Sequence, residues 1–558
     1  MRYPGATPVL IVGGGPVGLT LSVLLSGHGV PHLLVEAHPD TSRHPKARGV
    51  SARSMEVFRR CGLEEEVRRA GLPASQVFFY RGRSLVDPDF VRTGVAAGAA
   101  EDAERTPTPG LICSQDALEA VLLRRARQLA PDGVRFATRL LSLTPRDGHV
   151  QALLEDRTTG ERHTVRADWL VGCDGASSTV RTAAGIEMAG PTGLGHFLSI
   201  RFEAPLGEVV ADRASTSYFL TEPGRGGFLA VDNDRRWIYQ YPYDPELPGI
   251  DALLSDCGAL ARLVREAAGL PGLAVTVQDT MTWRMDARLA GAYRRARVLL
   301  AGDAAHVVPP TGGHGMNTGI GDADNLAWKL AAVTAGTAGE ALLDTYEAER
   351  RPVARQVIDI SLANSRARAG YRIDDELLLT AAYRSTAVLA DPTAPERPPL
   401  DPDREHPDGT PGTRLPHLRL PGPPGAAATS TLDLVGPGFT LFTTATEDAG
   451  WQHQADTATA AGLPVTVHTL APPDWARATG LPATTGGAVL VRPDGHIAWR
   501  AQQPPAGEGE LLTILRRLLS AAQATSPSVQ PEGAPTSPRP PLSAGRAGSS
   551  DGRSRWSR

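Results

Sequence analysis

The feature that most constrains the fold is a short apolar run that leads directly into a cluster of glycines near the start of the chain. Residues 9–12 read VLIV and residues 13–18 read GGGPVG, after which the sequence is again apolar. In a strand, turn and helix unit of this kind, the first glycine permits a sharp turn, the second lets the backbone approach a pyrophosphate, and the third allows close packing of helix on strand. The helix start then faces the anion. The predicted cofactor-binding residues here are Gly13, Gly15, Pro16 and Gly18.

A second apolar strand is predicted at residues 32–35, and it ends in Glu36. An acidic side chain at this distance from the glycines typically binds the hydroxyl groups of a ribose. Glutamate in place of arginine favours a ribose without a phosphate. The alternative for the glycines is an ordinary loop turn, but the flanking strand, helix and acidic residue favour a nucleotide site.

Two more apolar strands end in carboxylates. Residues 170–175 read LVGCDG and residues 298–303 read VLLAGD, so Asp174 and Asp303 each follow a buried strand. Ligands of open α/β sheets lie at such strand ends, where Asp303 can accept hydrogen bonds from a sugar-alcohol chain such as ribityl. The alternative is that the aspartate only forms a turn.

A glycine run at 312–315 precedes Met316, Asn317 and an apolar helix predicted to reach Leu330. It offers backbone N–H groups and the positive end of a helix to an anion. A reduced flavin ring is such an anion. Taken together, the glycine motifs therefore indicate a flavin cofactor.

In order and spacing these motifs resemble the group A flavoprotein aromatic hydroxylases, the p-hydroxybenzoate hydroxylase family. The resemblance implies that Glu36 binds the adenosine ribose of FAD and that Asp303 binds its ribityl chain. It also implies that Asp174 touches both FAD and NAD(P)H. Arg48, or else Arg53, resembles an arginine that contacts FAD, although a solvated charge at a helix end is the alternative. The other implied flavin ligands are Gln115, Gly302, Gly313, Gly315, Met316 and Asn317.

The same resemblance implies the chemistry. NADPH or NADH, docked transiently, would reduce FAD, and O2 would form a flavin C4a-hydroperoxide that hydroxylates an electron-rich aromatic ring. The backbone carbonyl of Pro310 is expected near the substrate hydroxyl. His314 could add positive charge near the flavin or bind the substrate, or it could be a loop histidine. His306 is expected to be a structural partner of the Asp303 turn.

The fold class predicted from these motifs is α/β. A Rossmann-type FAD-binding domain comprises residues 1–74, 102–186 and 282–390, and a substrate domain with an antiparallel sheet comprises residues 75–101 and 187–281. Alternation in one predicted strand places Trp237, Tyr239 and Tyr241 on one face. These residues are candidates for substrate binding, and packing in a core is the alternative.

The C-terminal part resembles the thioredoxin-like domain of phenol hydroxylases and natural-product hydroxylases. A proline-rich linker is predicted at 391–425, the domain at 426–523, and a disordered tail at 524–558. All four cysteines precede the domain, so it has no CxxC pair and should be structural.

Composition bounds the remaining possibilities. The net charge of the 558-residue chain is only -4, which implies no nucleic-acid partner. Four scattered cysteines favour a reducing cytoplasm, and the first apolar stretch is too short to span a membrane. No metal site is predicted, and the chain is expected to be a monomer or a homodimer that acts on a small aromatic molecule.

The substrate is less constrained. An appended C-terminal domain and a lysine-poor composition suggest a polycyclic aromatic polyketide or indolocarbazole intermediate, by association alone. Baeyer–Villiger insertion, oxidative decarboxylation, antibiotic inactivation and non-catalytic binding of a flavin or aromatic metabolite are the alternatives. A dehydrogenase or halogenase fits less well, because the segment around Trp237 lacks the halogenase pattern WxWxIP.

Overall fold

The computed structural model describes residues 3–94, 104–246, 249–366, 376–391, 397–401, 408–420, 429–443, 450–470, 472–481 and 486–520. These residues belong to one unit, Met1–Ala521. The tail predicted to be disordered lies outside the described residues, as do parts of the predicted linker.

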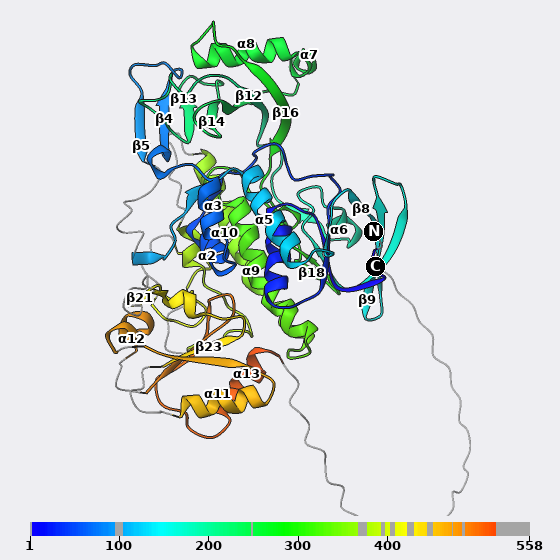
Figure 1. The fold of residues 1–558 in the computed structure, drawn as a ribbon, viewed down its shortest axis with the longest axis vertical. Helices are drawn as coiled ribbons and strands as arrows, with labels where there is room; N and C mark the ends of the chain where they lie inside the picture. Colours follow the sequence, from blue (N-terminus) through cyan, green and yellow to red (C-terminus); the bar gives the residue numbers. More distant parts are fainter. Residues whose placement is uncertain are drawn as a thin grey trace, which may run out of the picture. The chain divides into compact units, whose positions relative to one another are not determined.

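The first sheet is a mixed sheet with a parallel centre. Its main order is β18-β19-β10-β1-β2-β7, and β8 and β9 form an antiparallel extension next to β10. Figure 1 labels β8, β9 and β18 of this sheet. The parallel strands are β1 (Ala6–Val12), β2 (His32–Val35), β7 (Val134–Arg135), β10 (Arg162–Gly172) and β19 (Val298–Leu300). The antiparallel strands are β8 (Thr138–Arg146), β9 (His149–Asp156) and β18 (Arg294–Arg295).

Helices with apolar faces pack against this sheet and form its core. Helix α1 is buried on nearly all sides, since it packs against both α5 and α9. Pro16 occupies its first turn, where the missing N–H costs no hydrogen bond. The helices of this part are α1 (Pro16–Gly27), α2 (Ala52–Arg60), α3 (Glu64–Ala70), α5 (Gln115–Leu129), α6 (Thr179–Ala183), α9 (Gly315–Thr334) and α10 (Asp344–Arg366).

Short elements connect these parts of the chain. Strands β3 and β6 pair with each other, and β11, β17 and β20 form a small antiparallel sheet. The short strands are β3 (Gly49–Val50), β6 (Leu111–Ile112), β11 (Met188–Ala189), β17 (Arg288–Ala290) and β20 (His306–Val307). The 3-10 helices are η1 (Ala74–Gln76), η2 (Gly302–Ala304), η3 (Glu340–Leu343) and η4 (Leu377–Thr380).

The order of the parallel strands fixes where a ligand can bind. The chain passes from β1 to β2 on one side and later adds β10 on the other side of β1. A crevice forms where strand order reverses in this way, at the carboxyl ends of the strands. All four predicted strand-end motifs, at Gly13, Glu36, Asp174 and Asp303, follow the carboxyl ends of these strands.

The second sheet has the order β16-β12-β15-β14-β13-β4-β5. It is antiparallel as predicted, except that β4 and β13 are parallel. Figure 1 shows α8 on the side of this sheet that faces away from α9 and α10. Its elements are β4 (Phe78–Gly82), β5 (Val91–Gly94), β12 (Gly195–Glu203), β13 (Ser217–Leu220), β14 (Gly227–Ala230), β15 (Arg236–Pro242), β16 (Thr276–Met285), α7 (Ile250–Ser255) and α8 (Cys257–Ala268).

The face of the second sheet beneath α8, here called the outer face, carries a separate hydrophobic core. Trp237 and Tyr239 are fully buried in this core, and Tyr241 packs against it. The prediction that these aromatic residues bind substrate is therefore wrong for Trp237 and Tyr239, and the core alternative holds. The alternate residues of each strand point to the opposite side, here called the inner face.

A four-stranded C-terminal sheet has the order β24-β23-β25-β26. Its β23-α11-β24 unit is parallel, and an antiparallel β25-β26 hairpin and α13 follow, which is a thioredoxin-like arrangement. The four cysteines are free and lie outside it. The elements are β21 (Arg419–Leu420), β22 (Thr429–Ser430), η5 (Thr431–Leu434), β23 (Phe439–Thr443), α11 (Trp451–Ala460), β24 (Val465–Thr469), α12 (Pro472–Thr479), β25 (Ala488–Val491), β26 (Ile497–Ala501) and α13 (Glu510–Leu518).

The described part of the predicted linker is not a free connection. Residues 408–420 pack against the C-terminal sheet, where Leu415 and Leu418 are buried and Arg414 bridges to His496.

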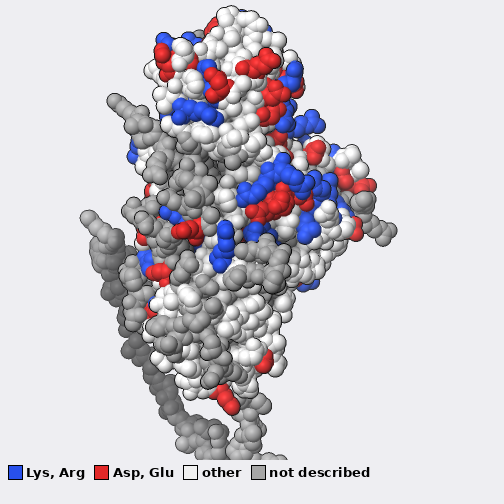
Figure 2. Space-filling model, turned by 60° about the vertical axis from the view of Figure 1, so that its left-hand side comes forward, with Lys and Arg blue, Asp and Glu red and all other residues white. Residues whose placement is uncertain are grey.

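No helix among the described residues combines the length and apolar character needed to cross a membrane. On the face shown in Figure 2, acidic and basic side chains are interspersed.

Candidate cofactor and substrate site

The turn after β1 has the geometry that its glycines require. Gly13 adopts a φ of +115°, and a Cβ there would lie 2.3 Å from the carbonyl oxygen of Cys173. A Cβ on Gly18 would lie 2.0 Å from the carbonyl oxygen of Gly13, so α1 approaches the turn too closely for any side chain. Gly15 differs, because its Cβ would meet nothing within 4 Å. Two glycines thus shape the turn, and the third leaves open space beside a helix start.

Glu36 braces this turn from the end of β2. Its carboxylate accepts hydrogen bonds from the backbone N–H of Gly14 at 2.7 Å and from that of His38 at 2.8 Å. The His38 ring also lies 2.6 Å from the carboxylate, through Nδ1. An acidic group is therefore held beside the glycine turn, where the family pattern expects a ribose.

Asp303 follows β19 and lies within η2. Its side chain is exposed to solvent, and no described residue donates a hydrogen bond to its carboxylate. Desolvation by the surrounding protein raises the pKa of this carboxyl, which follows a strand of the first sheet at the edge where a crevice is expected. An acceptor without a partner in such a crevice suits a ligand with hydroxyl groups.

The glycine run forms a turn in front of α9. The N–H of Gly313 donates to the carbonyl oxygen of Pro310 at 3.0 Å, and Gly312 and Gly313 have φ values of +129° and +73°. The Pro310 carbonyl thus uses one lone pair inside the chain and keeps a second for another donor. No side chain caps the start of α9. Its first N–H groups are therefore available to an anion.

His314 does not supply positive charge. Its side chain is almost fully buried, and burial lowers its pKa to about 4, so the imidazole is neutral near pH 7. A neutral His314 would add no positive charge beside a flavin, and its binding of the substrate stays a prediction. The glycine pattern gave no sign that the loop would fold over this residue.

The side chain of Asn317 is fully used within the protein. Its carbonyl oxygen accepts from the Ser51 N–H at 2.9 Å and the Ser54 hydroxyl at 2.8 Å. Its amide donates to the carbonyl oxygens of Gly49 and Gly313 at 3.0 and 2.8 Å. Asn317 therefore ties the glycine loop to β3 and α2, and only its backbone could face a ligand. Met316 packs against the core of the first sheet.

His306 is linked to the turn that contains Asp303 through a third residue, Asp322. Its Nε2 lies 2.7 Å from a carboxylate oxygen of Asp322 in α9, and the same oxygen accepts from the Gly302 N–H at 3.1 Å. The second oxygen of Asp322 accepts from Arg350 at 2.8 Å. Burial opposes ionisation of Asp322, but the charges of His306 and Arg350 outweigh it and lower the pKa of that carboxyl.

The two arginines suggested as FAD ligands point elsewhere. Arg48 donates to the carbonyl oxygens of Thr216 and Ala230 at 2.7 and 3.0 Å, and so docks against the second sheet. Arg53 donates to Glu56 and Asp324, and also to the backbone carbonyl of Asp494 in the C-terminal part. Nothing in their sequence context distinguished these partners.

Gln115 and Asp174 also have partners within the chain. Gln115 accepts from the Ala47 N–H at 3.2 Å and donates to Glu119 at 2.7 Å, so it holds the 41–48 loop. Asp174 accepts from the Ser178 hydroxyl and the Val180 N–H, and thereby caps α6. The side chains of both residues therefore serve local structure.

The loop does bring one cation to Asp303, which the sequence reasoning missed. The charge of Lys46 acts on Asp303, on Glu119 and on His44. Lys46 is exposed and makes no hydrogen bond to a described side chain. The sequence offered one signal for Lys46: it lies two residues before Arg48, which was itself predicted to contact FAD.

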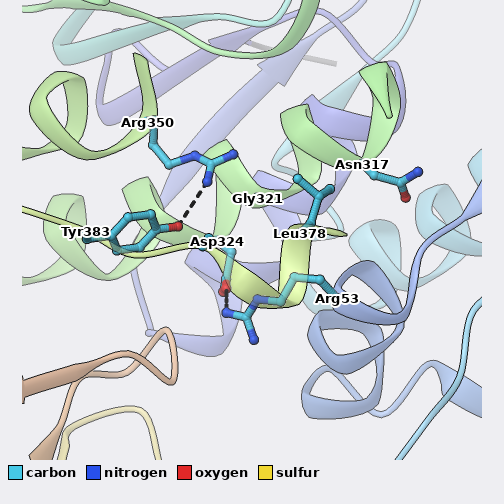
Figure 3. Close-up of a pocket in the computed structure, with 8 residues that line it drawn as sticks. Arg53, Asn317, Gly321, Asp324, Arg350, Leu378 and Tyr383 are labelled. Carbon is cyan, nitrogen blue, oxygen red and sulfur yellow. Dashed lines mark hydrogen bonds and ion pairs between the residues drawn. The ribbon is translucent and has the colours of Figure 1, made fainter. Parts of the chain in front are cut away.

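Figure 3 shows a small cavity whose wall includes Asn317, Gly321 and Asp324 of α9. Its volume is about 10 Å³, about the room for one water molecule. Arg53 pairs with Asp324 at its wall, and Arg350 donates to the Tyr383 hydroxyl. The cavity is too small for an organic ligand, and it lies where α9 packs against α2, α10 and the segment that contains η4.

The crevice at the first sheet fits FAD on its own chemistry. It combines an open glycine at a helix start, an acidic residue at the end of β2, an acceptor without a partner at Asp303 and an uncapped α9 start. These features define an FAD-binding oxidoreductase of the α/β class.

Comparison with known proteins narrows this class. The FAD binding domain family matches residues 6–361, and the family described as aromatic-ring hydroxylase, C-terminal, matches residues 408–522. The chain belongs to the FAD-dependent aromatic-ring hydroxylases, and it is an FAD-dependent aromatic monooxygenase.

Relatives with assigned activities align over most of their length. Tetracenomycin A2 monooxygenase-dioxygenase of Streptomyces glaucescens is 38% identical over 94% of this chain and 99% of its own. Aklavinone 12-hydroxylase of Streptomyces peucetius is 38% identical over 79% of this chain and 92% of its own. The structure of aklavinone-11 hydroxylase with FAD and aklavinone superposes with a TM-score of 0.80 at 34% identity, covering 93% of this chain and 100% of that one.

Proposed function

We propose that this enzyme hydroxylates a phenolic polycyclic aromatic substrate of the polyketide type, with NADPH or NADH as a transiently bound reductant and O2 as co-substrate. The observation that carries the proposal is the carboxyl edge of the first sheet, where the open turn at Gly15 and the carboxylates of Glu36 and Asp303 follow the strand ends. The names of relatives that act on tetracenomycin and aklavinone support the substrate class.

The chain's own residues have two tasks toward the cofactor. FAD, once bound and reduced, supplies the activated oxygen. Gly15 and the start of α1 would receive the pyrophosphate, Glu36 the ribose, and Asp303 the ribityl hydroxyl groups. The open N–H groups at Gly315 would stabilise negative charge on the reduced ring, and Lys46 would add the positive charge that His314 lacks.

Toward the substrate, the chain would orient a hydroxyl group and exclude water. The free lone pair of the Pro310 carbonyl can accept the hydrogen bond of a substrate phenol. That contact favours electron donation into the ring and directs the hydroxyl toward the glycine loop. The inner face of the second sheet is the proposed opposite wall of the site.

The wider organisation follows the same proposal. Residues 1–74, 102–186 and 282–390 would form the FAD-binding domain, and residues 75–101 and 187–281 the substrate domain. The enzyme would work in the cytoplasm as a monomer or homodimer.

The test is a turnover experiment with purified protein. NAD(P)H oxidation is followed in air and without oxygen, first with simple phenols and then with tetracyclic naphthacenequinones. Substrate-dependent oxidation with one oxygen atom gained by mass supports the proposal, and NMR separates ring hydroxylation from insertion into a ring. The proposal is contradicted if NAD(P)H does not reduce the bound FAD in the presence of any of the aromatic compounds.

A further inference from the structure

The inner face of the second sheet carries a stacked aromatic pair. Phe197 on β12 and Trp283 on β16 are direct cross-strand neighbours. Their rings stack with centroids 4.4 Å apart and planes 14° apart. Both side chains are only partly buried, in contrast to Trp237 on the outer face, which is fully buried. The stack therefore leaves ring surface accessible on the face of the sheet opposite α8.

Chain connectivity places this pair toward the glycine loop. Strand β16 ends at Met285, and the next strand, β17, begins at Arg288. Arg288 pairs with Val307 of β20, which leads directly into Pro310 and the glycine run. The stacked pair thus lies at the end of the second sheet that is joined to the proposed flavin loop.

A chain of polar contacts fixes one ring of the pair. The indole N–H of Trp283 donates to the carbonyl oxygen of Gln240 at 3.1 Å, and the Gln240 amide donates to the Ser199 hydroxyl at 2.9 Å. Ser199 lies 2.6 Å from Nε2 of His44, and Nδ1 of His44 lies 3.5 Å from the carboxylate of Asp279. Trp283 itself therefore contacts Phe197 of β12 and Gln240 of β15, and the chain of contacts continues from Gln240 through Ser199 to the 41–48 loop.

Hydrogen-bond chemistry gives this chain a single direction. An indole only donates, so it fixes the Gln240 amide with its oxygen toward Trp283. The amide then donates to Ser199, whose one proton is left to point at Nε2 of His44. Nε2 is therefore the acceptor, and the neutral imidazole carries its hydrogen on Nδ1, toward Asp279.

The charge state of His44 agrees with this direction. Burial lowers the pKa of His44, and Arg201 and Lys46 add to the lowering, whereas Asp279 opposes it. The ring is thus neutral near pH 7 and can accept from Ser199. A buried, neutral histidine between a serine and an exposed carboxylate is a rigid link between the loop and the sheet.

We propose that the Phe197–Trp283 stack is the binding platform for the planar rings of the substrate. We further propose that the hydrogen bonds from His44 through Ser199 and Gln240 hold Trp283 in the orientation that stacking requires. The inference rests on the proposed function, since it names the surface on which a polycyclic aromatic substrate lies. His44 is a positioning residue in this proposal, because it acts through Ser199 and Gln240.

Binding measurements on the FAD-loaded enzyme test the platform. Dissociation constants are measured by absorbance titration for a hydroxylated naphthacenequinone and for phenol, with the wild type, Phe197→Ala and Trp283→Ala. Loss of ring stacking should weaken the four-ring probe about 10-fold and leave phenol nearly unaffected. Retained FAD and an unchanged melting temperature establish that the variants fold, and Trp283→Phe serves if Trp283→Ala does not.

A double-mutant cycle tests the positioning role. His44→Gln should weaken the naphthacenequinone in the wild-type background but add nothing to Trp283→Phe, which has already lost the indole donor. His32→Gln is the matched control, because His32 is also buried and hydrogen-bonded to a serine, Ser22, but on the first sheet. It should leave the binding of both probes unchanged.

The outcomes separate this inference from the proposed function. The platform is overturned if the wild type turns over the naphthacenequinone but the Phe197 and Trp283 variants bind both probes equally less tightly. It is also overturned if these variants bind both probes as tightly as the wild type does. Additive effects of His44→Gln and Trp283→Phe would overturn the positioning role. A wild type in which no aromatic compound brings about NAD(P)H oxidation would instead contradict the proposed function itself.

Discussion

At the residue scale, the first glycine motif contains two different constraints. Gly18 is required by the fold, because a Cβ there would collide with the backbone of Gly13. Gly15 has open space on the same side and is required only if a ligand fills it. The same substitution at the two positions therefore separates folding from cofactor binding.

We expect Gly18→Ala to lower the free energy of unfolding of the apoprotein by about 1–3 kcal/mol, because the backbone must move to relieve the collision. Gly15→Ala should leave that free energy nearly unchanged and weaken FAD binding. Urea unfolding of the apoprotein and fluorescence titration with FAD check both. An equal loss of stability in the two variants would contradict the assignment of Gly15 to the ligand.

His314 gives a second prediction at this scale. Because burial holds its pKa at about 4, it does not titrate between pH 6 and pH 9. His314→Asn should therefore leave the shape of the pH profile of kcat unchanged over this range, whatever it does to the rate. A limb near pH 6.5 that disappears in the variant would show that the histidine is charged in the working enzyme.

At the scale of elements, α9 connects the flavin loop to the rest of the protein through Asp322. The carboxylate accepts hydrogen bonds from the Gly302 N–H and from Arg350, and it contacts the His306 ring; all three residues are buried. Its role is to hold η2 and the start of α9 in a fixed relation. Asp303, which lies in η2, depends on it for position.

We expect Asp322→Asn to cost about 3–5 kcal/mol of folding free energy, since it leaves the buried Arg350 without its ionic partner. FAD affinity should fall as well, because Gly302 loses its acceptor. Thermal unfolding and FAD titration measure the two effects. Asp344→Asn is the control, since the exposed side chain of Asp344 pairs with Arg294. A similar loss of folding free energy in this control would show that the effect of Asp322→Asn does not come from its buried ion pair.

The elements that the sequence predicted are those with local causes. The turn at Gly13, the strand before it and the helix after it follow from apolar runs and glycine geometry, which need no distant partner. The face of β15 was harder, because alternation places Trp237 and Tyr239 together but does not say which face α8 covers. The partners of Arg48, Arg53 and Asn317 come from segments far away in the sequence, so no local pattern could identify them.

At the scale of the whole described unit, fully buried ion pairs join the C-terminal part to helices α2 and α10, which belong to the part of the chain that contains the first sheet. Arg414 binds the carboxylate of Glu56 in α2, at 2.7 Å for its shortest contact. Arg492 binds Glu349 in α10, which also holds Lys329 of α9. Isolated buried charges are costly, so each partner depends on the other.

This dependence predicts a response to acid. Burial alone would raise the pKa of Glu56, but Arg414 and Arg53 outweigh it and lower the value from 4.5 to about 2. A carboxyl whose pKa is depressed by folding stabilises the protein above its unfolded value and loses that contribution as pH falls toward its folded value. The advantage of Glu56 should thus be complete above about pH 5 and vanish between pH 4.5 and 2.

Glu56→Gln should therefore lower the melting temperature at pH 7, with a loss of about 3 kcal/mol in free energy, and the gap to wild type should close as the pH approaches 2. Differential scanning calorimetry from pH 7 to pH 2.5 measures the gap. Glu66→Gln, at an exposed pair with Arg124, is the control and should show no gap at any pH. A gap independent of pH would mean that the ion pair is not its cause.

The buried pairs also bear on how such enzymes can diversify. A C-terminal part that met the rest through apolar surface alone could be exchanged between relatives as a cassette, and the new surfaces would adapt. Here the incoming part would have to carry the partners of Glu56 and Glu349, or it would leave carboxylates stranded without counter-charge. Recombination between lineages should therefore succeed only where α2, α10 and the C-terminal sheet are inherited together.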